Sequence, residues 1–429
     1  MKMKKVLAVL LVVAIAAAIC VSVVACGDRD NKVNELELPA YDVESPDYSK
    51  LQIPSTFKIG MICLHDENST YDKNFIEAMY EAQTKFKLSD DQVKIITGVP
   101  EGDECYQKAC ELADDGCDII FADSFGHEPY MLKAAKKYPK VLFAHATGTT
   151  AHTEKLDNFV NAFASIYEGR YLAGVAAGLK LNEMIAAGKF KAEEAKMGYV
   201  GAFTYAEVMS GYTSFYLGAK SVCPSVTMDV TFTGSWYDET AENNAAKKLI
   251  AAGAKLISQH ADSMGAPNAC EEAGVPNVSY NGSTLKACPD TFIVSSRINW
   301  APYYEYLIAS KVKGEKVAKD WIGTIKTGSV VLTNVGGDAA AKGTVEKIVE
   351  VREKLAKGEI KVFDTANFTV GGKKLTTYMA DVDTDAAFTP DTEAIENGIF
   401  EESKFRSAPY FNVEIDGITL LDRNYGKNN

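Results

Sequence analysis

Short apolar runs alternate with amphipathic stretches along the chain from residue 57 onward. Apolar runs rich in Val, Ile and Phe are typical of buried strands, whereas apolar residues spaced three and four apart indicate helices. In the first half this pattern predicts four strands separated by three helices, at 57–63, 73–88, 93–97, 103–115, 117–122, 128–138 and 140–145. The same order returns later, at 196–201, 205–221, 226–232, 239–252, 254–259, 265–273 and 276–280. Alternation of this kind predicts an α/β fold with parallel sheets flanked by helices.

The repeated unit predicts two lobes, each built on one sheet, with a ligand cleft between them. The strand at 291–297 and the helix at 300–313 are expected to cross back to the first lobe. Two independent domains without a shared site are the alternative, although the connections near residues 160 and 290 are short for a linker. The predicted boundaries are 57–160 with about 291–325 for lobe 1, and about 161–290 with about 326–429, which includes a small strand-containing C-terminal extension, for lobe 2.

The segment 159–187 links the two units and has Gly169, Gly174 and Gly178 inside a helical pattern. A glycine in a helix interior costs about 1 kcal/mol relative to alanine. We therefore expect this helix to pack closely against a sheet.

The N-terminus has the pattern of a secreted protein. Lys2, Lys4 and Lys5 precede an apolar stretch at 6–24, and small residues then lead to Cys26. This arrangement is typical of a secretory signal and resembles a bacterial lipobox, so residues 1–25 are predicted to be a lipoprotein signal peptide and Cys26 the lipidated residue. A plain signal peptide and a membrane-spanning helix are the alternatives. The polar segment 26–56 is predicted to be a flexible tether.

Composition restricts the classes of function. The chain has 45 basic and 58 acidic residues and a formal net charge of −13, which disfavours binding to nucleic acid polymers. Nine cysteines and five histidines are scattered, without CxxC pairs, so no zinc site is expected and the thiols are interpreted as buried and free. The chain also has no P-loop, HExxH or dinucleotide-binding glycine motif. No cofactor or metal is therefore predicted, and a binding protein remains.

In parallel sheets, the residues just beyond the carboxyl ends of the strands line the ligand crevice. Asp72 is also expected to cap the helix that follows the first strand, and Tyr71 and Phe75 offer rings for stacking, although capping and core packing are the plain alternatives. In the first lobe this rule gives the candidates Tyr71, Asp72, Asn74, Phe75, Ser124, Phe125, Gly126 and His145.

The second lobe adds aromatic and polar groups at the matching positions. Trp236 and Trp300 are predicted to reach the crevice, and ordinary packing between the lobes is the alternative for either one. Asn281 can pair with an amine and ring-nitrogen edge, and Asp262 can accept from an amine, a ring N–H or a sugar hydroxyl. The candidates of this lobe are Trp236, Asp238, Asp262, Asn281 and Trp300.

One motif suggests an enzyme. Ala122 to Gly126 nearly matches the G-x-S-x-G elbow of α/β-hydrolases, with Ser124 as the nucleophile. Asp238 and His260 follow in the chain order that a triad needs. The first glycine is replaced and no oxyanion segment precedes the motif, so binding of a ligand by Ser124 and the neighbouring amides is the simpler interpretation.

The chain resembles the basic membrane protein family, the lipoprotein substrate-binding components of ABC importers, over about residues 57–335. The resemblance rests on YDKNF (71–75), IIFADSFG (119–126), YEGRYLAG (167–174), GYVG (198–201), GSWYD (234–238) and QHADS (259–263). It implies a two-lobed type I periplasmic-binding-protein-like fold that binds purine nucleosides or nucleobases. Trp236 and Gln259-His260 are more similar to the nucleobase-binding branch. Asn281-Gly282 replaces the Gly-x-Asp of the nucleoside branch.

These observations predict a lipid-anchored receptor on the outer face of the cell membrane. It closes its lobes on a purine base or nucleoside by hinge motion, hands it to an ABC permease, is monomeric, and is held to the membrane through Cys26. A sugar or another small molecule is the alternative ligand, because Trp236 stacks as well on a pyranose. A serine hydrolase using Ser124 is the third hypothesis.

Overall fold

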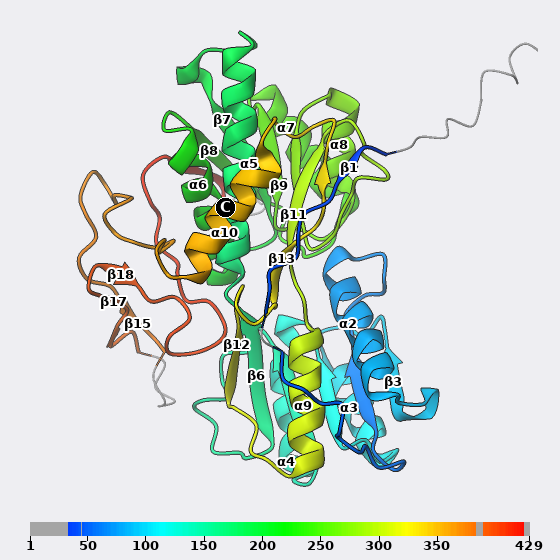
Figure 1. The fold of residues 1–429 in the computed structure, drawn as a ribbon. Helices are drawn as coiled ribbons and strands as arrows, with labels where there is room; N and C mark the ends of the chain where they lie inside the picture. Colours follow the sequence, from blue (N-terminus) through cyan, green and yellow to red (C-terminus); the bar gives the residue numbers. More distant parts are fainter. Residues whose placement is uncertain (1–32, 44, 383–388, 424–429) are drawn as a thin grey trace, which may run out of the picture. The chain divides into compact units, whose positions relative to one another are not determined.

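Two β-sheets, each flanked by helices, organise the protein (Figure 1). The computed structural model describes residues 33–43, 45–382 and 389–423. In spatial order the first sheet consists of β12 (Asp320–Gly323), β6 (Phe159–Ala164), β5 (Leu142–Ala146), β4 (Ile119–Ala122), β2 (Ile59–Ile62) and β3 (Val93–Ile96). All of its neighbouring strands are parallel.

The second sheet is also mainly parallel. In spatial order it consists of β13 (Val330–Leu332), β11 (Phe292–Ile298), β10 (Asn277–Tyr280), β9 (Leu256–Gln259), β7 (Lys196–Gly201), β8 (Thr227–Phe232) and β19 (Ile418–Asp422). The pair of β11 and β13 is antiparallel, whereas the other neighbours run parallel. The prediction of an α/β fold with parallel sheets is therefore confirmed.

Helices cover these sheets, and each sheet with its helices is one lobe. The first lobe has α2 (Thr70–Phe86), α3 (Asp103–Asp114), α4 (Glu128–Lys137) and α9 (Ala301–Lys313). The second lobe has α5 (Ile166–Ala186), α6 (Ala206–Val222), α7 (Glu239–Ala251), α8 (Gly265–Ala273) and α10 (Thr344–Ala356). Single 3₁₀ turns occur at η1 (Asp90–Gln92), η2 (Phe125–His127) and η3 (Ala192–Glu194).

The chain passes between the lobes after Ala164, after Ile298 and after Gly323. Strand β11 belongs to the second sheet, where it pairs with β10 and β13, so the prediction that 291–297 returns to the first lobe is wrong. The return begins one element later, because α9 packs on α2 and β4. A strand and the helix after it thus belong to different lobes, and an alternation pattern read from sequence cannot place such a junction.

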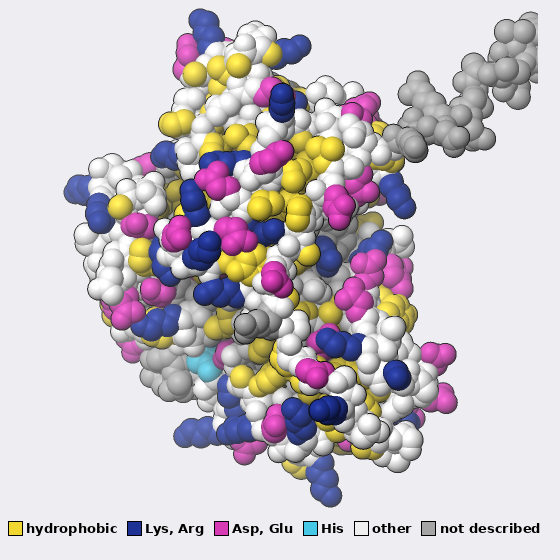
Figure 2. Space-filling view, in the orientation of Figure 1, with side chains coloured by type: hydrophobic (Ala, Val, Ile, Leu, Met, Phe, Trp, Pro, Cys, Tyr) yellow, Lys and Arg dark blue, Asp and Glu magenta, His cyan; other side chains and the backbone are white. Residues whose placement is uncertain are grey.

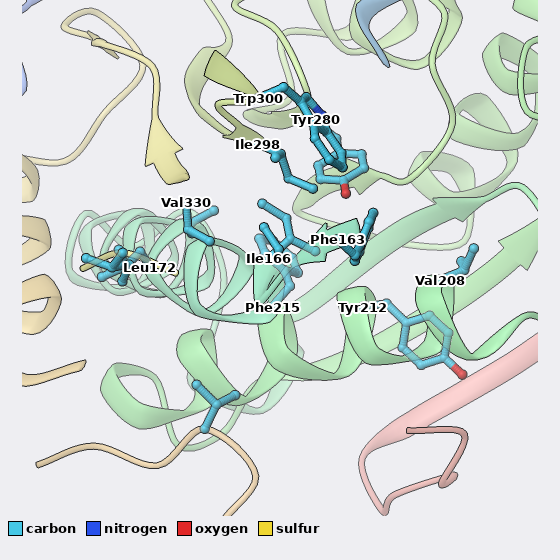
Figure 3. Close-up of a cluster of buried hydrophobic side chains, with 14 of the residues drawn as sticks. Phe163, Ile166, Leu172, Val208, Tyr212, Phe215, Tyr280, Ile298, Trp300 and Val330 are labelled. Carbon is cyan, nitrogen blue, oxygen red and sulfur yellow. The ribbon is translucent and has the colours of Figure 1, made fainter. Parts of the chain in front are cut away.

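One apolar core runs through these crossings. Phe163 at the end of β6 and Ile166 at the start of α5 lie in the same buried cluster as Ile298 and Trp300, which flank the second crossing (Figure 3). Two smaller clusters fill the outer faces of the sheets. The connecting segments are therefore held by buried side chains on both sides of these two crossings.

The glycines of α5 permit close packing, and the predicted packing against a sheet is confirmed, because a Cβ at Gly169 would lie 3.0 Å from Val330 of β13 and 3.2 Å from Ser296 of β11. The other two glycines face a helix. A Cβ at Gly174 would lie 2.0 Å from the carbonyl oxygen of Phe215, and one at Gly178 would lie 2.5 Å from that of Ala219. Both contacts are with the backbone of α6, a helix rather than a sheet. Glycine is needed where two helix backbones approach this closely.

The segment predicted to be a flexible tether packs on the protein from Glu35 onward. Strand β1 (Glu35–Leu36) pairs with β14 (Val335–Gly336), and Leu38 N donates to Asn334 Oδ1 at 3.1 Å. Arg352 Nη1 donates to Pro39 O at 2.6 Å. The tether prediction is therefore wrong for this part, because apolar side chains such as Tyr48 and Leu51 pack against the core. The predicted signal peptide and Cys26 lie outside the described residues.

The C-terminal extension contributes short strands, as predicted. β15 (Met379–Ala380) pairs with β16 (Thr392–Glu393), and β17 (Ile395–Glu396) pairs with β18 (Ile399–Phe400). β19 joins the edge of the second sheet beside β8, and α10 packs on α5. No helix among the described residues is long and apolar enough to cross a membrane. On the face drawn in Figure 2, acidic side chains lie among the basic ones.

Candidate functional site

A cavity of about 310 Å³ lies between the lobes, at the carboxyl ends of the parallel strands. Its first-lobe wall follows β2, β4 and β5, and its second-lobe wall follows β7 to β10. The C-terminal segment supplies a third side. The cavity is lined by Leu64, His65, Tyr71, Asp72, Ser124, Phe125, Thr147, Thr149, Thr204, Tyr205, Ala206, Glu207, Trp236, His260, Asp262, Tyr280, Arg406, Ala408 and Pro409.

In the first-lobe wall, hydrogen-bond donors surround the carboxylate of Asp72. Its carboxylate accepts from His65 N at 2.8 Å and from Ser69 Oγ at 2.6 Å. The helix α2 is capped by Ser69, whose side chain accepts from Asp72 N, so Asp72 is not the cap that the sequence predicted. Burial opposes ionisation of Asp72, but hydrogen bonds from His65 and Ser69 hold its pKa below the usual value. Asp72 is therefore a fixed negative acceptor.

A second buried carboxyl lies behind Asp72. Burial and the charge of Asp72 raise the pKa of Asp123 well above its usual value, and burial likewise raises that of Cys63. The ligand atoms of these three residues lie within 4.8 Å of one another. We interpret the group as an ionised Asp72 beside a protonated Asp123 and a neutral Cys63 thiol. A neutral thiol and a protonated carboxyl are poor metal ligands.

In the second-lobe wall, the carboxyl group of Asp262 has a different hydrogen-bonding environment from that of Asp72. Asn281 Nδ2 donates to Asp262 Oδ1 at 3.1 Å, and Asp262 is 5% exposed. Burial, followed by the charges of Asp72 and Glu242, raises the pKa of Asp262 well above its usual value. A carboxyl that holds its proton can donate as well as accept a hydrogen bond.

A third carboxylate, Glu207, is oriented by a buried hydrogen-bonded chain. His260 Nε2 lies 2.7 Å from Glu207 Oε1, and His260 Nδ1 lies 3.2 Å from Tyr199 Oη. Arg170 Nη2 donates to Tyr199 Oη at 2.9 Å, so Tyr199 donates to Nδ1 and His260 donates from Nε2 to Glu207. The fully buried Arg170 thus fixes the direction of a carboxylate at the cavity wall.

Aromatic rings make up much of the remaining surface. Trp236 lies edge-on to Phe203, with centroids 4.9 Å apart, and Phe203 stacks on Tyr205 at 5.0 Å. Across the mouth, Phe125 of the first lobe contacts Tyr205 at 5.3 Å. Phe125 and Tyr205 are 38% and 42% exposed, so this pair forms the rim where the two lobes meet.

The lobes also bond to each other directly. Thr70 N and Oγ1 donate to Asp262 O at 3.2 and 3.1 Å, and Asn74 Nδ2 donates to Asn281 O at 2.9 Å. These bonds join the start of α2 to the strand ends of the second lobe. The lobes are therefore closed around the cavity.

Several predicted site residues lie in the cavity wall, and others do not. The structure brings together Tyr71, Asp72, Ser124, Phe125, Trp236 and Asp262. Phe75 and Trp300 instead stack on each other at 4.4 Å in the core of the first lobe, where both are buried. Both belong to the apolar core rather than the lining, because their rings pack under the strand ends and not beyond them.

The other predicted residues support the wall from behind. Asn74 and Asn281 join the lobes to each other and to Asp262. Gly126 N donates to Glu101 Oε1 at 2.8 Å. The ring of His145 is fully buried, with Nε2 2.7 Å from Ser124 O.

Asp238 is the helix cap of α7. Its carboxylate accepts from Ala241 N at 2.9 Å. The carboxylate therefore stabilises the start of α7, and Asp238 is not among the residues that line the cavity, whereas Trp236 is.

The structure adds lining residues that were not among the site predictions. His65, Thr147, Thr204, Tyr205 and His260 occupy strand ends, so the positional rule that gave Asp262 also covers them. Glu207 lies in the first turn of α6 and Tyr280 is the last residue of β10. The C-terminal Arg406, Ala408 and Pro409 had no signal in the sequence, because they follow no strand of either sheet.

Among the described residues, the contacts of Ser124 differ from those of a hydrolytic serine. Its Oγ donates to Glu101 Oε1 at 2.6 Å. His145 contacts the main-chain oxygen of Ser124, and His260 is bound to Glu207 and Tyr199. With Asp238 capping α7, the residues that the triad hypothesis combined are engaged separately.

The chain is similar to known solute-binding proteins. Its structure matches an ABC transporter solute-binding protein from Conexibacter woesei with a TM-score of 0.56 and 21% identity, over 71% of this chain and 97% of the other. It matches one from Aeropyrum pernix with a TM-score of 0.59 and 17% identity, over 71% and 92%. These likenesses confirm the periplasmic-binding-protein-like fold.

Relatives matched by sequence have higher identity to this chain than these two structures have. A purine-binding protein of Brucella abortus is 33% identical over 63% of this chain and 73% of its own length. A putative ABC transporter glucose-binding protein of Haloferax volcanii is 29% identical over 60% of this chain, and the match spans 62% of that protein. The family model of the PnrA-like ABC transporter substrate-binding proteins matches residues 59–366. The chain therefore belongs to this family, the Bmp family of ABC transporter substrate-binding proteins.

Proposed function

We propose that this protein binds a purine nucleobase or nucleoside between its lobes and delivers it to an ABC permease. The observation that carries the proposal is the meeting of aromatic rings and carboxyl groups in one closed cavity, with Trp236 and Tyr205 beside Asp72, Asp262 and Glu207. A planar heterocycle has two apolar faces and a polar edge, and this cavity offers a surface for each.

The energetics favour such a ligand. Stacking of a base on an aromatic side chain contributes about 1–3 kcal/mol. Asp72 and Glu207 accept hydrogen bonds from ring N–H or amino groups, and Asp262, with its raised pKa, can also donate to a ring nitrogen. The Brucella relative, named as a purine-binding protein, supports the same class of ligand.

Within this class a free base fits better than a nucleoside. The cavity of about 310 Å³ is near the lower end of the range of about 300–1,000 Å³ for ligand pockets. Asn281, at the position where the nucleoside branch has its Gly-x-Asp segment, is engaged by Asp262 and Asn74. It is therefore occupied within the protein rather than directed to a ribose.

A sugar is the second candidate. The Haloferax relative is named as a putative glucose-binding protein, and the Trp236 ring is as suitable for the apolar face of a pyranose. Both ligands would use the same carboxyl groups, so only binding measurements separate them.

Isothermal titration calorimetry tests the proposal. The protein is first unfolded in denaturant and refolded, so that any ligand carried from the cell is removed. It is then titrated with adenine, guanine, hypoxanthine, adenosine, guanosine, inosine and glucose. We expect heat with bases and weaker binding of nucleosides. Heat with glucose and none with any purine would overturn the proposal.

Two further measurements test whether the protein binds purines without converting them. Purines are expected to be recovered unchanged after binding, and an ester substrate is expected to show no turnover. Turnover that is abolished by Ser124→Ala would restore the hydrolase hypothesis.

We further propose that the protein acts as a monomer on the outer side of the cell membrane, anchored through lipidated Cys26. Mass spectrometry of protein from a bacterial membrane is expected to show an acylated N-terminal Cys26, and Cys26→Ser is expected to abolish the acylation. An unmodified Cys26 in mature protein would reject the anchor.

A further inference from the structure

The C-terminal strap, residues 401–411, closes one side of the cavity. It lies beyond the part of the chain that the family model matches, yet Arg406, Ala408 and Pro409 line the cavity. The strap is well packed, since Glu402, Ser407 and Phe411 are buried. A segment outside the common fold of the family therefore contributes directly to the site.

The strap is bonded to both lobes. Ser210 Oγ of α6 donates to Glu402 Oε1 at 2.5 Å. On the other side, Ser407 N and Oγ donate to Asp320 Oδ1 of β12 at 2.9 and 2.7 Å. Because Ser407 is next to Arg406 in sequence, the bonds to Asp320 fix the backbone that places Arg406 in the cavity wall.

Arg406 is held by uncharged acceptors. Its Nε donates to Ala408 O at 3.2 Å, Nη1 to Asp381 O at 3.3 Å and Nη2 to Pro409 O at 3.4 Å. A guanidinium has five N–H donors and no acceptor, so these three bonds leave one N–H on each terminal nitrogen. Burial lowers the pKa of Arg406, and the acidic groups that oppose this most, Asp381 and Asp320, are outside the cavity lining.

The cavity therefore presents hydrogen-bond acceptors at some positions of its wall and hydrogen-bond donors at another. Asp72 and Glu207 offer acceptors, whereas Arg406 offers donors only. Arginine pairs bidentately with O6 and N7 of guanine, both of which are acceptors, whereas adenine presents an amino donor at position 6. An arginine in the wall thus discriminates between purines by the group at that position.

We propose that Arg406 is a specificity-determining residue that binds the oxo edge of the ligand, so that the protein prefers 6-oxopurines over 6-aminopurines. The inference rests on the proposed binding of purines and adds the substituent that the site selects. The ring N–H beside the oxo group of such purines suits the carboxylate acceptors of the same cavity.

Calorimetric titration of ligand-free protein with hypoxanthine, guanine and adenine tests the inference. Wild type is expected to bind the two oxopurines at least tenfold more tightly than adenine, and Arg406→Met is expected to lose this preference. Arg406→Lys keeps the charge but not the paired donors, so an intermediate preference is expected. Arg423→Met is the matched control, because Arg423 pairs with Glu414 on the surface.

The outcomes separate the two proposals. Equal or tighter binding of adenine by wild type, or an unchanged preference in Arg406→Met, would overturn the role of Arg406 while leaving purine binding intact. No purine binding by wild type would overturn both. If Arg406→Met fails to fold in a circular dichroism melt, the wild-type preference and Arg406→Lys decide.

Discussion

The two walls of the cavity each present a buried aspartate, but they hold it in opposite ways. Asp72 in the first lobe accepts from His65 N and Ser69 Oγ and is kept ionised. Asp262 in the second lobe receives one side-chain donor, from Asn281, and its pKa is raised by burial and by acidic neighbours. The number of donors around each carboxylate, rather than its burial, decides which of the two keeps its proton.

This difference assigns the walls different roles. Besides offering an acceptor to the cavity, Asp72 is part of the structure of the helix start, because its partners fix the loop after β2 and the cap of α2. Asp262 has fewer donors than Asp72, and in the proposed function the ligand supplies a further hydrogen-bonding partner. Proteins commonly retain such destabilising groups at functional sites.

Replacing Asp72 gives the largest expected loss of stability. Asp72→Ala leaves His65 N and Ser69 Oγ without their acceptor, and a buried donor without a partner costs about 1–3 kcal/mol. We expect a loss of about 2–3 kcal/mol in the free energy of unfolding at pH 7, measured by urea denaturation. Because the pKa of Asp72 is lowered in the folded state, the loss is expected to shrink as the pH falls below about 4.

Asp262→Ala is the matched variant in the other wall. An equal loss of stability in the two variants would remove the distinction between a structural and a ligand-directed carboxylate.

The aromatic side of the second wall is tested by Trp236→Ala. Removal of the indole is expected to weaken purine binding at least tenfold, about 1.4 kcal/mol, as measured by calorimetry. Trp321→Ala is the control, because Trp321 packs on Tyr303 in the first lobe, with centroids 4.9 Å apart. Wild-type affinity in Trp236→Ala would make this tryptophan a packing residue.

The proton on Asp262 is tested by the pH dependence of stability. A raised pKa in the folded state contributes stability below the unfolded pKa of about 3.9, and this contribution is lost as the pH rises through the folded pKa. A tenfold difference between the acid dissociation constants of the folded and unfolded states corresponds to about 1.4 kcal/mol. We therefore expect Asp262→Asn to match wild type near pH 4 and to be more stable than wild type at pH 8, by urea denaturation. Asp262→Asn that is less stable than wild type at pH 8 would contradict the raised pKa.

The arrangement of strands was largely predictable from the sequence, because buried parallel strands are continuous apolar runs. Its main failure, the placement of β11, has a physical cause. The chain leaves the second lobe between a strand and its following helix, and this junction has the same sequence pattern as a strand–helix junction within one lobe. The tether prediction failed because the segment after Glu35 uses a few scattered aromatic and aliphatic contacts, which have no period.

The rule that residues beyond strand ends line the crevice placed Trp236 and Asp262 in the cavity wall, where the structure has them. The rule does not tell which contacts the neighbouring side chains make. Asn281 and Asp238 also follow strand ends closely, and Phe75 lies in the helix after β2, yet these residues are used by Asp262, by α7 and by the core. Arg406 is the reverse case, a lining residue that no strand end precedes. It reaches the cavity from the C-terminal strap, and only long-range packing brings it there.

Asp238 provides the smallest and most discriminating test of the second wall, because it is two residues from Trp236. Its carboxylate caps α7 by accepting from Ala241 N, and loss of such a cap costs about 1 kcal/mol. Asp238→Ala is therefore expected to lower the free energy of unfolding by about 1 kcal/mol and leave purine affinity within about twofold, whereas Asp238→Asn preserves both, because asparagine caps helices about as well as aspartate. A tenfold loss of affinity in Asp238→Asn would show that the carboxylate charge serves the ligand, and the second wall would then hold three ligand-directed acids, with Asp262 and Glu207, rather than two.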